Sequence, residues 1–189
     1  MRFIYLLLLA TVLFSPACGD DDDGTGTSVV LLGRFEGWQL AQIGSNLEAS
    51  LSDAIGTIPD STLAAYDTTR QQLLDASAAF VEATVGLQPC EQDDVVFFDN
   101  GIVAYGQDGE PCPANSGPSV LMPFDTKTYS TDLQVTDLTI TDPATQTNSV
   151  YRVDLLTEES LVITQTRVVP ESLPVPEYRY EITYRFTAR

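Results

Sequence analysis

A period-two alternation near the C-terminus constrains the fold more than any other feature of the sequence. Between positions 178 and 187, every second residue is large and apolar: Tyr178, Tyr180, Ile182, Tyr184 and Phe186. Successive side chains of a β-strand point to opposite faces, so this pattern places all of these residues on one face. We therefore expect a strand that presents one aromatic face to a hydrophobic core.

Turn signals divide the rest of the C-terminal half into short strands. Asn100-Gly101 tolerates the positive φ angles of a tight turn and predicts a hairpin between strands at 95–98 and 102–105. Further strands are predicted at 129–141, 150–156 and 161–169, with a change of apolar face at Asp137-Leu138 that indicates a bulge or turn. The span 112–123 is rich in Pro, Gly, Ser and Asn and is expected to be a loop. Such a series of strands is typical of an all-β sandwich or barrel.

The N-terminal part of the domain is predicted to contain one strand and two helices. The strand covers 38–43, with Trp38, Leu40 and Gln42 on one face. Apolar residues then recur at helical spacing from Leu47 to Ile58, after Ser45-Asn46, which can cap a helix. The insertion 45–88 is therefore expected to be an αα segment.

The second predicted helix begins at Pro59-Asp60-Ser61 and carries one apolar stripe: Leu63, Tyr66, Leu73, Phe80 and Leu87. Four of these residues are seven apart, which is also the spacing of a dimer seam. The commoner arrangement is a helix that packs against its own domain. Exposure of Tyr66 and Phe80 would favour an interaction surface, whereas their burial would weaken it.

The first 17 residues are predicted to be a secretory signal peptide. Met1-Arg2 provides positive charge, an apolar run follows to Phe14, and small residues precede Cys18. The apolar run is too short to span a membrane. Residues 15–19 resemble a lipobox, which implies lipid attachment, with palmitate among the acyl groups, at Cys18; an ordinary signal peptide with a cysteine at its end is the alternative.

Residues 18–28 are expected to form an acidic, Gly-rich tether. Four consecutive aspartates, Asp20 to Asp23, cannot be buried and stay solvated. The stretch also resembles the acidic export signal of Bacteroidota lipoproteins, which implies lipid anchoring at the outer membrane, on the cell surface. The net charge of −18 argues against nucleic acid as a partner.

Cysteine usage agrees with export. If Cys18 carries lipid, Cys90 and Cys112 remain as a pair that an oxidising compartment would join. The loop closed by such a disulfide would stabilise the fold by about 3 kcal/mol. A metal pair or a nucleophilic cysteine is the alternative, but the chain has no histidine to serve either role. We expect neither a metal nor a cofactor.

Several segments resemble the lipocalin-like domain family of Bacteroidota lipoproteins. They are the opening 33–40, Cys90-Glu91-Gln92-Asp93-Asp94, Phe97 to Gly101, the strand 138–141, the segment 155–163 and the closing aromatic strand. The resemblance covers about 35–44 and 90–189. It implies a small antiparallel up-and-down β-barrel over 29–189, in which the helical insertion 45–88 lies between the first and second strands. It implies little about activity.

Three classes of function follow from these observations. We expect no enzyme, because the chain has no histidine and cannot form a Ser-His or Cys-His pair. After the tether, the one dense acidic cluster is Glu91, Asp93 and Asp94, and one such cluster is expected by chance in so acidic a chain. Tyr105 and Lys127 have no evident catalytic partner.

The first non-catalytic class is an interaction or structural module of the cell envelope that docks to a neighbouring protein or a glycan system. The second is a carrier barrel for a small hydrophobic ligand. The candidate lining residues of the carrier are Trp38, Phe97, Tyr129, Tyr151, Tyr180 and Tyr184. Aromatic residues at period two more often form a core.

Overall fold

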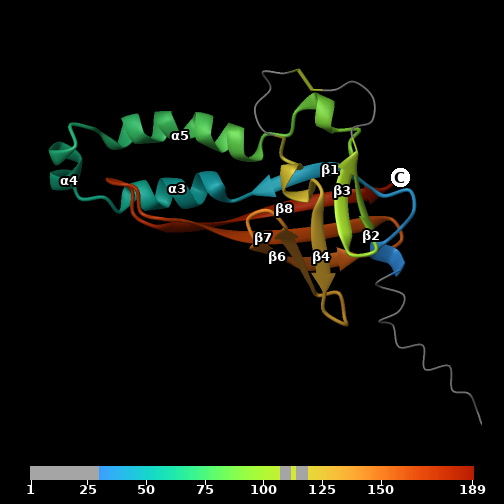
Figure 1. Ribbon diagram of the computed structural model, residues 1–189. Coiled ribbons are helices and arrows are strands. Elements are labelled where there is room, and N and C mark those ends of the chain that lie inside the picture. Colours follow the sequence, from blue (N-terminus) through green and yellow to red (C-terminus); the bar gives the residue numbers. More distant parts are fainter. Residues whose placement is uncertain (1–29, 107–111, 114–118) are drawn as a thin grey trace, which may run out of the picture.

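The computed structural model describes residues 30–106, 112–113 and 119–189, in which eight antiparallel strands close a barrel (Figure 1). Each strand pairs with the next one along the chain, and the last pairs with the first. The strands are β1 (Trp38–Ser45), β2 (Val95–Asp99), β3 (Ile102–Gly106), β4 (Lys127–Thr131), β5 (Asp137–Asp142), β6 (Thr147–Leu156), β7 (Ser160–Val169) and β8 (Tyr178–Ala188). The predicted lipocalin-like, up-and-down architecture with a helical insertion after the first strand is confirmed.

The hairpin of β7 and β8 is the longest regular pairing of the barrel. Ten consecutive residue pairs join the strands without a bulge, from Ser160 opposite Thr187 to Val169 opposite Tyr178. The predicted aromatic face of β8 is confirmed, because Tyr180, Ile182, Tyr184 and Phe186 are all buried in the barrel core. By contrast, two residue pairs join β1 to β2 and two join β3 to β4.

Strand β1 contains a bulge that the sequence pattern did not reveal. The register against β8 shifts between Leu40 and Gln42. A bulge adds one residue and exchanges the two faces beyond it. Consequently, the prediction that Gln42 shares a face with Trp38 and Leu40 is wrong: Gln42 is exposed, and Ile43 packs against the core.

The insertion contains three helices: α3 (Leu47–Gly56), α4 (Asp60–Ala65) and α5 (Arg70–Val85). They form an arm that projects from the barrel, with α4 at its far end (Figure 1). The single helix predicted from Pro59 onward is wrong, because the chain turns between α4 and α5, where Asp67 has a φ of 49°. A capping box starts α5 anew: the Gln72 amide donates to Thr69 Oγ1, and the Thr69 amide donates to Gln72 Oε1.

Polar contacts fix both ends of the arm. Asn46 does not cap α3 with its side chain; instead its Oδ1 accepts from the Glu181 amide at 2.7 Å and holds the helix start to β8. At the far end, the Arg70 guanidinium donates to Asp60 and to the carbonyl of Ile58. These bonds tie the beginning of α5 to that of α4.

A second, smaller hydrophobic core lies within the arm. Leu51, Ile55, Ile58 and Leu63 are buried together, and Tyr178 and Val175 from the β7–β8 hairpin pack against them with Leu73 and Leu74. The long hairpin therefore contributes to both cores. Helix α5, however, has no buried residue along its 16 positions.

Two tight turns shape the barrel strands. Asn100 and Gly101 have φ angles of 47° and 79°, which confirms the predicted hairpin turn. The segment predicted at 129–141, with a bulge or turn at Asp137-Leu138, is split into β4 and β5 by a turn that lies earlier, at 132–136. Leu133 is 84% exposed, whereas Val135 is buried at a φ of 53°, an angle that a β-branched residue rarely adopts.

Asp132 holds this turn together with its carboxylate. One carboxylate oxygen accepts from the amides of Thr136 and Asp137 at 2.6 and 3.0 Å, and the other accepts from the Thr136 hydroxyl at 2.7 Å. The hydrogen bond from the Asp137 amide is the main cause that lowers the pKa of Asp132. The turn is therefore best stabilised when this carboxyl group is ionised.

We expect Asp132→Asn to lower the thermal midpoint at pH 7, and the difference from wild type to shrink as the pH falls below about 4. A carboxyl group whose pKa is lower in the folded state stabilises the fold above its unfolded value, here 3.8, and loses this effect as pH falls through the folded pKa. Thermal melts from pH 7 to 2 measure this, with Asp53→Asn on exposed α3 as control. A constant difference at all pH values would contradict the assignment.

Candidate functional site

The barrel interior is filled by its own side chains. Among the candidate lining residues, Trp38, Tyr151, Tyr180 and Tyr184 are 0 to 4% exposed and belong to one core cluster. Tyr129 packs against this cluster, with its ring edge-on to Phe98 at 5.3 Å between centroids. Phe97 lies on the other face of β2, because its neighbours Val96 and Phe98 point into the cluster.

One end of the barrel is sealed by the residues that precede β1. The indole nitrogen of Trp38 donates to the carbonyl of Leu32 at 2.9 Å, and Leu32 is 1% exposed. The guanidinium carbon of Arg34 lies 5.0 Å from the centroid of the Trp38 ring, a cation–π contact. We call this the closed end.

The short helix η2 (Met122–Phe124) inserts into the opposite end, which we call the barrel mouth. The Phe124 ring packs against Tyr184, Tyr151 and Phe186 at centroid distances of 5.3, 5.6 and 5.9 Å. The prediction of an unstructured loop over 112–123 is therefore wrong at its end, where η2 begins. Phe124 lies just beyond that span, and no periodicity in the sequence marked it as a core residue.

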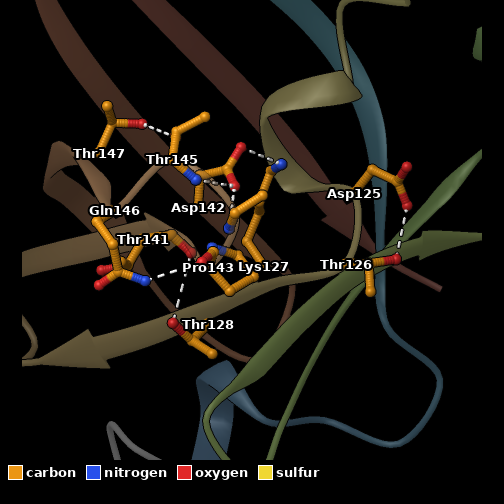
Figure 2. A network of polar contacts seen from close by, with 11 residues as sticks. Asp125, Thr126, Lys127, Thr128, Thr141, Asp142, Pro143, Thr145, Gln146 and Thr147 are labelled. Atoms are coloured by element: carbon orange, nitrogen blue, oxygen red, sulfur yellow. Dashed lines mark hydrogen bonds and ion pairs between the residues drawn. The ribbon is translucent and has the colours of Figure 1, made fainter.

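A cavity of about 420 Å³ lies at the barrel mouth and is named here the mouth cavity. Its lining comes from β4 to β8, η2 and the C-terminal part of α5, and includes Lys127, Asp142, Ser149, Arg167 and Tyr184. Lys127 Nζ lies 2.7 Å from Asp142 Oδ2 (Figure 2). The same carboxylate accepts from the amide of Ala144 through Oδ1, so it also fixes the β5–β6 turn.

Arg167 is the second cation of the mouth cavity. Its Nε donates to Gln165 Oε1 at 2.7 Å, and the side chain of Gln165 is buried. Burial by itself would lower the pKa of this guanidinium, but the nearby hydroxyls of Tyr184, Tyr180 and Tyr151 raise it overall. Within the described residues, no carboxylate forms an ion pair with Arg167.

The Tyr151 hydroxyl lies beneath this part of the mouth cavity. Tyr151 is fully buried, and its oxygen has no well-formed hydrogen bond to any described residue. Its closest polar neighbours, Arg167 and Ser149, both line the cavity. Burial raises the pKa of Tyr151 and of Tyr184, so both phenols stay protonated and remain hydrogen-bond donors.

The second concave surface is a groove of about 310 Å³ on the arm, named here the arm groove. It runs between α3, α5 and the β7–β8 loop, and its lining includes Leu51, Ile55, Leu73, Phe80 and Val175. Phe80 is 44% exposed, and Tyr66, at the end of α4, is 46% exposed. Of the predicted apolar stripe, Leu63 is buried and Leu73 and Leu87 are half-buried.

Two residues of the acidic cluster Glu91, Asp93 and Asp94 are buried and do not face solvent. Glu91 is fully buried; its Oε2 accepts from the Gln88 amide and its Oε1 from the Val120 amide, both at 3.0 Å. Asp94 is also buried. Of the other residues considered for catalysis, Lys127 is paired with Asp142 and Tyr105 packs against the core.

The disulfide between Cys90 and Cys112 is formed, as predicted. It lies next to Glu91 and joins the short helix η1 (Pro89–Glu91) to the segment that leads to η2. The disulfide and the Glu91 carboxylate therefore act on the same loop. Cys18, the predicted lipid-attachment residue, lies outside the described residues.

Comparisons with protein-family models, curated proteins and solved structures found no match to the chain. The strand order and the helices define an eight-stranded barrel domain with a helical arm, which carries the mouth cavity and the arm groove. None of the helices in the described part of the chain is long and apolar enough to cross a membrane. Nor do three or more Cys, Asp or Glu side chains of the described residues gather where they could hold a metal ion.

Glu91→Gln is expected to destabilise the protein by about 1–3 kcal/mol. Each carboxylate oxygen of Glu91 accepts a hydrogen bond from one backbone amide, and the glutamine side chain replaces one of these oxygens with an NH₂ group that cannot accept. Urea unfolding under oxidising conditions measures this loss. Glu177→Gln, on an exposed loop, makes the same charge change and should leave stability nearly unaltered. Equal midpoints for Glu91→Gln and wild type would contradict the structural role of Glu91.

Proposed function

We propose that this protein is a non-catalytic module of the bacterial cell envelope that docks a partner protein on the arm groove. One observation carries the proposal: Phe80 and Tyr66 are 44% and 46% exposed on an arm whose longest helix has no buried residue. Phe80 lines the arm groove, and Tyr66 adds a second exposed aromatic side chain at the far end of the arm. Large exposed aromatic residues are typical of protein interaction sites. Apolar side chains such as Leu51, Leu73 and Phe80 line the groove, and the apolar face of an amphipathic segment binds to surfaces of this kind.

The charge of the arm indicates the kind of partner. Residues 46–88 contain six acidic side chains and one basic one, Arg70, which is already bonded to Asp60. Glu171 and Glu177 add negative charge on the loop that borders the groove. We therefore infer that the occupant is a basic, amphipathic segment of another protein. The negative charge of the arm would attract and orient such a segment.

The filled barrel interior favours docking over the carrying of a hydrophobic ligand. Trp38, Phe124 and Tyr151 are fully buried within the core cluster. An apolar carrier needs an enclosed apolar cavity, whereas the mouth cavity is lined by Lys127, Asp142 and Arg167. The alternative of a barrel that encloses a small hydrophobic molecule is thus the less supported one.

Export and anchoring complete the proposal. We infer that residues 1–17 direct export, that Cys18 carries lipid at the outer membrane on the cell surface, and that 18–28 is the tether. The support comes from the order of charged, apolar and small residues before Cys18 and from the aspartates after it. The Cys90–Cys112 disulfide agrees with an oxidising compartment. Membership of the lipocalin-like family of Bacteroidota lipoproteins stays part of this proposal.

Site-specific photo-crosslinking tests the docking site. A photoreactive phenylalanine at position 80 of the full chain, produced in its native cells, should give a discrete adduct with one envelope protein. The same group at Leu133, which is 84% exposed at the other end of the barrel, is the matched control and should give none. The adduct should map to a basic, amphipathic segment. No adduct beyond the Leu133 control, or an adduct with an acidic segment, would overturn the proposal.

Cys18→Ser tests the anchor separately. The variant should take up no labelled palmitate and should leave the membrane fraction, since the serine hydroxyl cannot form the thioether that holds the lipid. Cys90→Ser, which breaks only the disulfide, should keep its label. Label retained by Cys18→Ser would show that the anchor assignment is wrong.

A further inference from the structure

We propose that the mouth cavity binds a small molecule that carries a carboxylate on a short apolar body, with Arg167 as the partner of the carboxylate. This site is separate from the arm groove, so the proposal does not depend on docking. Three features of the cavity carry it: a cation that no described carboxylate pairs with, phenol and alcohol donors around it, and apolar side chains in its lining.

The first feature is the state of Arg167. A guanidinium has five N–H donors in a planar fork; the buried Gln165 side chain accepts from Nε, and the other neighbours of the group include the neutral hydroxyls of Tyr180 and Tyr151. The ion pairs among the described residues involve Arg70, Lys127 and Arg152, each with an aspartate. The chain has 27 acidic residues against 9 basic ones, yet among the described residues no carboxylate forms an ion pair with the half-buried Arg167. A carboxylate accepts two parallel N–H bonds from this fork.

The second feature is a set of neutral donors close to that guanidinium. Tyr184 and Ser149 line the cavity with Arg167, and the Tyr151 hydroxyl next to them has no well-formed hydrogen bond to a described residue. A buried hydroxyl left without a partner is costly. A carboxylate on Arg167 offers further lone pairs to such O–H groups, because each of its oxygens accepts about two hydrogen bonds.

The third feature limits the size and polarity of the ligand. Val120, Met122 and Ile140 form an apolar side of the cavity. Below the cavity, Phe124 fills the barrel and contacts Tyr184 and Tyr151, so a long chain cannot descend into the interior. A volume of about 420 Å³ suits a small organic acid.

Asp142 allows a test of whether the ligand of the mouth cavity is an anion or a cation. Its carboxylate lines the same cavity and neutralises Lys127 at 2.7 Å. Asp142→Asn removes the negative charge and frees Lys127, while the amide oxygen can still accept from Ala144 in the turn. An anionic ligand should bind this variant more tightly than it binds wild type, and a cationic ligand less tightly.

Calorimetric titration of the mature chain with octanoate tests the proposal, with octanamide as the neutral probe of equal size and inorganic phosphate as the second anion. Wild type should bind octanoate in preference to both. Arg167→Gln should weaken octanoate binding about tenfold or more, because a charged hydrogen-bond pair is lost. Arg179→Gln is the matched control, since Arg179 is exposed on the outer face of β8 and carries the same charge.

The Asp142→Asn variant keeps the test decisive even if Arg167→Gln fails to fold. For Asp142→Asn we expect a gain in octanoate affinity, which a misfolded protein would not show. Near-ultraviolet circular dichroism shows which variants are folded. Equal binding of octanoate and octanamide, absence of binding by both, or an unchanged affinity in folded Arg167→Gln would overturn the proposal. Phosphate binding tighter than octanoate binding would overturn the carboxylate assignment in favour of a phosphate ligand.

Discussion

The structure depends above all on the ten-residue pairing of β7 with β8. This hairpin is longer than the barrel requires, so its outer part extends beyond β1 and supports the arm. Along β8, Tyr180, Ile182, Tyr184 and Phe186 enter the barrel core, and Tyr178 packs against both the barrel core and the core of the arm. One alternating strand therefore joins the two hydrophobic cores. Where β1 leaves β8, Asn46 hydrogen-bonds to Glu181, so α3 starts at the point where the strand ends.

The barrel was predictable because its signals are local and repeated. The period-two face of β8, the Asn100-Gly101 turn and the spacing of apolar residues in the insertion each reflect backbone geometry that neighbouring residues decide. The cysteine pair followed from the number of cysteines once Cys18 was set aside. These features need no knowledge of distant contacts, and together they define the order of strands and helices.

The errors have a common physical origin in side chains that bond across the chain or within irregular turns. The bulge at Ala41 is set by the register between β1 and β8. The chain breaks before α5 because a capping box at Thr69 starts a new helix, and the continuous apolar stripe in the sequence obscured this signal. The turn held by Asp132 and the insertion of Phe124 are tertiary contacts. Arg167 was missed as a site residue because a single arginine in an alternating strand carries no local signal. Its position at the barrel mouth appears only after closure.

Helix α5 contributes residues to both proposed sites, so an occupant of either site contacts the same helix. Phe80 lines the arm groove, and Ala83 and Thr84, one turn further along, line the mouth cavity. No residue of α5 is fully buried, and half-buried side chains hold the helix: Val81 and Val85 pack against the barrel core, and Leu73 and Leu74 pack against the core of the arm. An occupant of either site adds contacts that hold the helix in place. If an occupant of each site holds α5 in the same position, linkage is reciprocal: the ligand of the mouth cavity favours docking in the arm groove to the same extent that docking favours the ligand.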